Sequence, residues 1–189
     1  ARVAALELPV AANASGTVAM SFSNPVSLAA LDGVANLHLT GSTEKNKVPL
    51  SGVATIRLRR GTAELTLQDL QAASASAGGS IVLNDRKEIA GEVKIGTADV
   101  DATFAELRRA GIRLDSVTPG MVTGPLQIEA SISGAIGSPI AQLNVASSRL
   151  VVKPVAKGGA LAGTLRAEAT ARGDRVTVKD LRFEQSPAS

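Results

Sequence analysis

Apolar and polar residues alternate along most of this chain with a period of two. The clearest example is the stretch GPLQIEASISG, in which Leu126, Ile128, Ala130 and Ile132 alternate with polar side chains. Because successive side chains of a β-strand point to opposite faces of its sheet, this stretch predicts a strand with one apolar and one polar face. The same alternation recurs around residues 37–39, 54–59, 63–68, 93–95, 161–170 and 176–178.

Glycines between these stretches predict the turns that connect them. Gly adopts positive φ without the steric penalty of a Cβ atom, so it is favoured in tight turns. The expected turn positions are Gly33, Gly41, Gly61, Gly78 with Gly79, Gly124, Gly134, Gly158 with Gly159, and Gly173 with Asp174. Strands joined by such short turns favour an antiparallel meander, because a parallel arrangement needs helical crossovers.

One segment has a helical pattern instead. In DVDATFAELRRAGI, residues 99–112, Val100, Phe104 and Leu107 recur at helical spacing. Asp99 or Asp101 can cap the N-terminus of this helix, and Gly111 suits the position after its C-terminus. The sequence therefore predicts an all-β fold with one short helix, near residues 99–111, that covers one end of the sheet.

A weak internal repeat suggests how the chain is organised. Residues 49–70 align with residues 160–181 at a constant offset of 111, with five identities in 22 positions. The first copy continues into another strand, whereas the second reaches the end of the sequence, so we expect the sheet to be cut partway through a repeat. The expected blocks are entering strands over 1–32, a first repeat block with the helix over 33–123, and a second, C-terminally truncated repeat block over 124–189.

Composition excludes several classes of protein. The 189 residues include no Cys, Trp or Tyr, only three Phe and a single His, and the net charge is +3. Without Cys the chain has neither disulfides nor Cys-based zinc sites, and scarce aromatics disfavour stacking of nucleic acid bases. We therefore expect no nucleic acid partner. No stretch predicts a signal peptide or a membrane-spanning segment.

Candidate catalytic chemistry is sparse. The single imidazole, His38, lies on the polar face of an expected strand, which favours an exposed surface residue over a catalytic base. Helix capping explains Asp99 and Asp101 better than Ca²⁺ binding does. The Gly-rich segments lack the lysine and the spacing of phosphate-binding loops. We expect no enzymatic activity, no catalytic residues, no metal site and no cofactor.

The apolar face, built from Leu, Ile, Val and Ala, is the remaining candidate for function. In one interpretation two halves of the sheet pack face to face into a closed core, which composition alone favours. In the other, the sheet curls without closing and leaves an aliphatic groove for an apolar ligand. Candidate lining residues of that groove are those that alternate onto the apolar face of each expected strand. They are Ile56, Leu58, Leu65, Leu67, Val93, Ile95, Leu126, Ile128, Ile132, Leu143, Val145, Leu165, Val176 and Val178.

Three kinds of segment carry a resemblance to a known family. The stretch from Gly124, with Gly134 and Pro139, is a unit of glycine, alternating strand, small residues, proline and next strand. The segments LTLQDLQAASASAGGSIVL and VTVKDLRFEQS share a strand followed by Asp-Leu, at Asp69 and Asp180. In ADVDATFAELRRAGI a short helix follows a strand. Because these segments follow one another along the chain, the chain resembles the AsmA-like superfamily, in particular its TamB branch of bridge-like lipid-transfer proteins.

The resemblance implies a β-taco, a long curled antiparallel sheet with an apolar interior groove. It implies a periplasmic protein anchored to the inner membrane by a segment not present in this chain. The implied function is a non-enzymatic conduit for phospholipid or another acyl-chain ligand, in lipid transport or outer-membrane biogenesis. An outer-membrane barrel protein is an implied partner, through regions outside this chain. A structural or adhesive β-repeat stalk with a closed core and no ligand stays open as the alternative.

Overall fold

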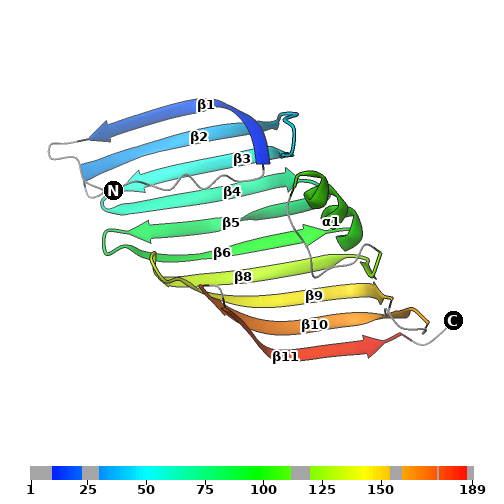
Figure 1. The fold of residues 1–189 in the computed structure, drawn as a ribbon. Coiled ribbons are helices and arrows are strands. Elements are labelled where there is room, and N and C mark those ends of the chain that lie inside the picture. The colour runs from blue at the N-terminus through cyan, green and yellow to red at the C-terminus, as the bar shows by residue number, and fades with distance from the viewer. Residues whose placement is uncertain (1–9, 23–29, 112–119, 154–158, 174, 187–189) are drawn as a thin grey trace.

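The structure is a computed structural model that describes residues 10–22, 30–111, 120–153, 159–173 and 175–186. Within these ranges it contains eleven strands and one helix (Figure 1). Their bounds are β1 Val10–Phe22, β2 Leu31–Gly41, β3 Val48–Arg59, β4 Thr62–Ala72, β5 Ala75–Asn84, β6 Glu88–Thr97, α1 Val100–Arg109, β7 Val122–Thr123, β8 Leu126–Ala135, β9 Ile140–Val152, β10 Leu161–Arg172 and β11 Arg175–Gln185.

All the strands belong to one sheet, and it is a meander. Ten strands follow each other in space as they do along the chain, from β1 to β6 and from β8 to β11, each antiparallel to the next. The short β7 lies off this path and pairs with the end of β9. Every stretch that alternates in the sequence lies in one of these strands, so the predicted all-β antiparallel fold is confirmed.

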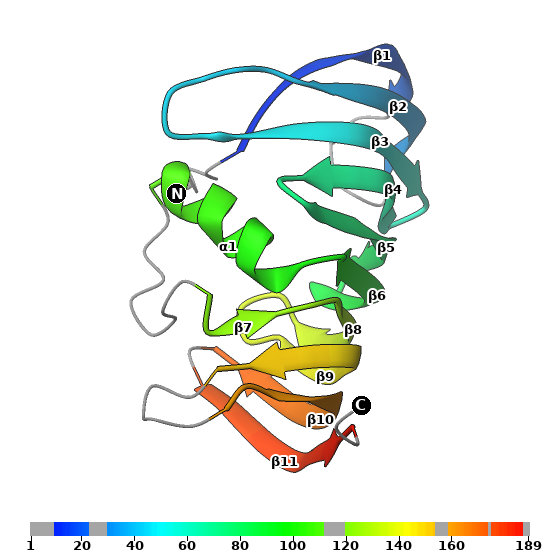
Figure 2. The ribbon, with the colours of Figure 1, turned by 90° about the vertical axis from the view of Figure 1, so that its right-hand side faces the viewer.

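The sheet is curled but not closed. Figure 2 shows that its two ends, β1–β3 and β9–β11, curve toward the side on which α1 lies. At its start β1 extends past the end of β2 and pairs in parallel with β3, Val10 opposite Val48 and Ala11 opposite Pro49. Ala11 and Val48 are buried at this corner.

Very little of the sheet is buried. In the described part of the chain no side chain is fully buried, and the buried hydrophobic residues are mostly alanines. A closed sandwich buries the inner faces of two sheets against each other, and these residues form only one. The closed core that composition favours is therefore wrong for the described residues, because no second sheet covers the apolar face and α1 covers only one end of it.

The helix begins and ends as the sequence predicts. Asp99 is the N-cap, with Oδ1 accepting a hydrogen bond from the backbone N–H of Asp101 at 3.0 Å. Gly111 follows the C-cap residue Ala110 with φ of 83°, and its N–H donates to the carbonyl oxygen of Arg108 at 2.9 Å. Gly therefore ends the helix in a left-handed conformation that other residues rarely adopt.

Some predicted turn glycines lie inside strands instead. Gly61 and Gly173 do form tight turns, but Gly33 is in β2, and Gly78 and Gly79 are in β5. A Cβ atom on Gly33 would lie 2.5 Å from the carbonyl oxygen of Ala19 in β1. The turn assignment is wrong at these three positions, and at Gly33 and Gly79 glycine instead permits close approach of a neighbouring strand. Gly158 and Asp174 lie outside the described residues.

The two copies of the internal repeat correspond to two hairpins, β3–β4 and β10–β11. Their last pairs before the turn are Arg59 with Thr62 and Arg172 with Arg175, which lie 113 positions apart rather than 111. The expected block boundary at 32/33 falls within β2, and the sheet continues across the boundary at 123/124 from β6 to β8.

Candidate functional site

The pairing of the strands collects the apolar side chains on one face. Directly opposite residues of an antiparallel pair point to the same side of the sheet. One row of opposite residues joins Ala35, Ile56, Leu65 and Ile81 across β2 to β5. A second row joins Ile95, Ile128, Val145, Ala167 and Leu181 across β6 to β11. We call this surface, which continues on every strand from β1 to β11 except the short β7, the inner face.

The structure places all fourteen candidate lining residues on the inner face. The chain of opposite pairs relates each of them to the two rows above without a change of side. They are Ile56, Leu58, Leu65, Leu67, Val93, Ile95, Leu126, Ile128, Ile132, Leu143, Val145, Leu165, Val176 and Val178. Their binding of a ligand stays a prediction.

The alternation of apolar and polar residues in the sequence did not identify every residue of the inner face. Ile81 lies in the run SIVL, where apolar residues fall on both faces and the phase cannot be read. Leu181 and Phe183 follow an irregularity at Lys179, because Glu168 pairs with Asp180 while Ala169 pairs with Val178. This extra residue shifts inner-face positions from even to odd numbers. The strand pairing, which the sequence alone does not give, is what places these side chains on the inner face.

The inner face is open to solvent at its rims and half-buried between them. The exposed fraction is 57% for Val178 and 65% for Leu181 in the edge strand β11, and 42% for Ile95 in the central strand β6. Leu65, Ile81 and most neighbouring inner-face residues are intermediate in burial. A large apolar patch left in water in this way is typical of a surface that binds a ligand or a partner.

The helix covers one end of the inner face. Val100 and Phe104 of α1 lie over Ile95, Leu126 and Ile128 of the sheet, and a small apolar cavity of about 130 Å³ lies between them. Val100 is buried in this contact. Figure 2 shows α1 on the concave side, where it leaves the rest of the face uncovered.

Hydrogen bonds hold the helix in this place. The hydroxyl oxygens of Thr97 in β6 and Thr103 in α1 are 2.7 Å apart, and Thr103 also donates to the carbonyl oxygen of Asp99 at 3.0 Å. Near the other end of the helix, the hydroxyl of Ser74 donates to Glu106 at 3.1 Å. The Thr pair satisfies two hydroxyls in an otherwise apolar contact, which avoids the cost of burying them unpaired.

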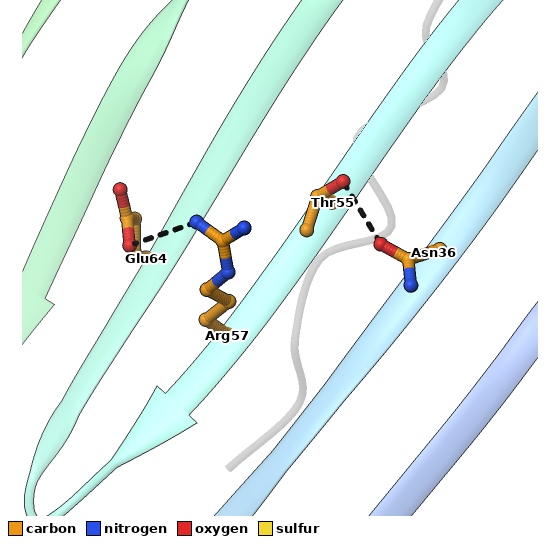
Figure 3. A network of polar contacts seen from close by, with 4 residues as sticks. All are labelled: Asn36, Thr55, Arg57 and Glu64. Carbon is orange, nitrogen blue, oxygen red and sulfur yellow. Dashed lines mark hydrogen bonds and ion pairs between the residues drawn. The ribbon is translucent and has the colours of Figure 1, made fainter.

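The opposite face, the outer face, is polar. Thr55 donates a hydrogen bond to the side chain of Asn36 at 3.1 Å, and Arg57 pairs with Glu64 at 3.9 Å (Figure 3). The Lys94 ammonium lies 2.8 Å from a carboxylate oxygen of Glu129, and this hydrogen bond raises the pKa of Lys94. These pairs are exposed, so they contribute solubility and register more than stability.

The three titratable residues considered in the sequence, His38, Asp99 and Asp101, have structural surroundings that explain them. His38 is exposed on the outer face, opposite Ser15 and Val53. Asp99 and Asp101 each accept backbone hydrogen bonds at the start of α1, from Asp101 and Gly120 respectively. No group of three or more His, Asp or Glu side chains among the described residues is placed to hold a metal ion.

Comparisons with known proteins found no match for this chain among family models, curated proteins or solved structures. In the described ranges, no helix has the length and apolar character needed to cross a membrane.

Proposed function

We propose that this chain is a segment of a non-enzymatic lipid conduit that holds phospholipid acyl chains against its inner face. The observation that supports this most is the continuity of the aliphatic surface across ten successive strands with one face left open. The resemblance to AsmA-like proteins extends the proposal to the periplasm, to an anchor in the inner membrane, and to an outer-membrane barrel protein as partner.

The dimensions suit acyl chains. Ten strands about 4.8 Å apart give a face about 43 Å long across the strands. A bilayer leaflet has a hydrocarbon thickness of about 15 Å, so two acyl chains fit end to end along this face. Each methylene that leaves water for the inner face contributes about 0.8 kcal/mol. An aliphatic surface makes few directional contacts, so bound chains are free to slide along it.

A charge on the inner face tests the proposal. Ile128 lies between Ile95 and Val145, and Ile132 lies between Gly91 and Ala141, both on β8. We expect Ile132→Asp, outside the part of the inner face that α1 covers, to reduce phospholipid that co-purifies from a bacterial host by about tenfold, because a carboxylate is costly to bury against acyl chains. Ile128→Asp, which places the charge beneath α1, should reduce it less. The measurement is native mass spectrometry with lipid extraction.

The control changes the same strand on its other face. Ser131 is exposed on the outer face of β8, so Ser131→Asp adds the same charge without touching the inner face. Lipid binding should be unchanged in this variant, and circular dichroism should show that all three variants are folded. Wild-type protein that carries no lipid and excludes added acyl chains would contradict the conduit and favour the structural or adhesive stalk.

A further inference from the structure

The cavity beneath α1 lies between two apolar surfaces. One wall is the helix, with Val100 and Phe104, and the other is the sheet, with Ile95, Leu126 and Ile128 of the inner face. The strands that form this wall are β5, β6 and β8, which lie in the interior of the sheet, away from its edge strands. Ile95 lines the cavity and is also 42% exposed, so the cavity is continuous with the open inner face.

A small residue of β5 makes room for this cavity. Ala75 lines it and stands directly opposite Thr97 of β6, which in turn stands opposite Leu126 of β8. These three inner-face residues form one row beneath α1, and Ala75 has only a methyl group as its side chain. A larger side chain at position 75 would therefore occupy the cavity while the backbone pairing stays the same.

The side-chain polar groups in the lining are already used. The Thr97 hydroxyl lies within hydrogen-bond distance of the carbonyl oxygens of Ser74 and Asp99, and it accepts a bond from the N–H of Asp99 at 3.1 Å. The Thr103 hydroxyl donates to the carbonyl oxygen of Asp99 at 3.0 Å and lies 2.7 Å from that of Thr97. A buried water needs about two to four polar partners. The cavity therefore suits an apolar occupant and disfavours a hydroxyl.

The volume suits the end of an acyl chain. The cavity measures about 130 Å³, and an apolar cavity of about 150 Å³ in a protein core stays dry and binds benzene or xenon. At roughly 30 Å³ per atom, the share of a water molecule in the liquid, it holds about four carbon atoms. A longer apolar ligand must therefore leave the cavity over the inner face, where aliphatic side chains continue.

We propose that the cavity beneath α1 binds the methyl end of an acyl chain whose remaining carbons lie on the inner face. This rests on the proposed function and deepens it, because it fixes where a chain that slides along the inner face comes to rest. A terminal methyl group is favoured in the cavity, whereas a polar chain end would lose its hydrogen bonds to water there. The site is therefore specific for unmodified chain ends.

Two fatty acids that differ only at the chain end test this specificity. Palmitate ends in a methyl group, and 16-hydroxypalmitate carries a hydroxyl on the same carbon. We expect the wild-type protein to bind palmitate about tenfold more tightly, because the hydroxyl would be buried without a partner. The measurement is isothermal titration calorimetry on delipidated protein. Both ligands have the same carboxylate, so contacts of the head group do not contribute to the difference.

Filling the cavity should remove this preference. We expect Ala75→Leu to weaken palmitate binding and to leave binding of 16-hydroxypalmitate nearly unchanged, so that the two affinities converge. The matched control is Ala63→Leu, the same substitution on the inner face near the start of β4, opposite Leu58 and Leu83 and outside the cavity lining. This control should keep the tenfold preference, and circular dichroism should show that both variants are folded.

Xenon tests the cavity without any lipid. Dissolved xenon enters apolar cavities of this size. It should shift the methyl resonances of Val100 and Ile128 in NMR spectra of the wild-type protein and not in those of Ala75→Leu. Palmitate should displace xenon from the wild-type protein, whereas 16-hydroxypalmitate should leave it bound.

Three results would overturn the proposal and leave the conduit intact. The first is equal affinity of the wild-type protein for the two fatty acids. The second is a tenfold preference that survives Ala75→Leu. The third is palmitate that binds and leaves xenon in place, which would put the chain end elsewhere on the inner face. A wild-type protein that binds xenon but neither fatty acid would contradict the conduit itself, and with it an acyl chain as the occupant.

Discussion

Two adjacent glycines of β5 have different structural roles. Gly79 has φ of 148°, and a Cβ atom built on it would clash with the carbonyl oxygen of Glu92 in β6. At Gly78 the nearest atom, the carbonyl oxygen of Leu67, is 3.4 Å away, an ordinary contact. Only Gly79 therefore combines a backbone conformation reserved for glycine with a contact that excludes a side chain.

Substitution of these two glycines by alanine should have unequal effects. We expect Gly79→Ala to lower the free energy of unfolding by about 1–3 kcal/mol, the usual cost of forcing a side chain into such a conformation. Gly78→Ala should change it by less than about 1 kcal/mol, because alanine loses less entropy than glycine on folding. Urea unfolding of both variants measures the difference. Equal losses would contradict the role assigned to Gly79.

At the scale of elements, α1 is attached to the sheet mainly through its N-terminal end. Asp99 Oδ1 accepts hydrogen bonds from the N–H groups of Asp101 and Gly124, at 3.0 and 3.3 Å. The N–H of Val100 donates to the carbonyl oxygen of Gly124 at 3.0 Å. One carboxylate therefore both caps the helix and ties it to the residues that lead into β8.

Removal of this carboxylate should loosen the helix more than the sheet. We expect Asp99→Ala to cost about 1 kcal/mol and Asp99→Asn only a few tenths, because Asn also caps helices well. Hydrogen–deuterium exchange should show faster exchange of the amides of Thr103 to Arg109 in the alanine variant, with β2–β4 unchanged. Uniform acceleration across the sheet would mean that the helix is not an independently anchored element.

The strands and the helix could be predicted from sequence because their signals are local. Alternation needs only neighbouring residues, and the Asp99 cap and Gly111 stop lie at the ends of one segment. The inner-face register beyond Lys179 and the role of Gly33 could not be predicted in this way. Both depend on how closely another strand approaches, which distant residues such as Ala19 determine.

At the scale of the whole molecule, stability does not come from a deep core. The described residues form one layer, and the buried hydrophobic residues among them are few and small. The ladders between ten strands supply most of the contacts, and the inner face stays in water. Small residues such as Gly91, Ala130 and Ala167 along this face keep it shallow, so there is room above the sheet for apolar chains.

Filling that room should reduce lipid binding without adding a charge. Ala130 lies between Val93 and Leu143 on the inner face, whereas Ala146 lies on the outer face opposite Gln127. We expect Ala130→Trp to lower the number of bound phospholipids in native mass spectra while it preserves or raises the free energy of unfolding, because the indole covers exposed aliphatic surface. Ala146→Trp adds the same side chain to the other face and should bind lipid like the wild-type protein. If both variants bound equal amounts of lipid, the acyl chains would have to lie elsewhere than over the centre of the inner face.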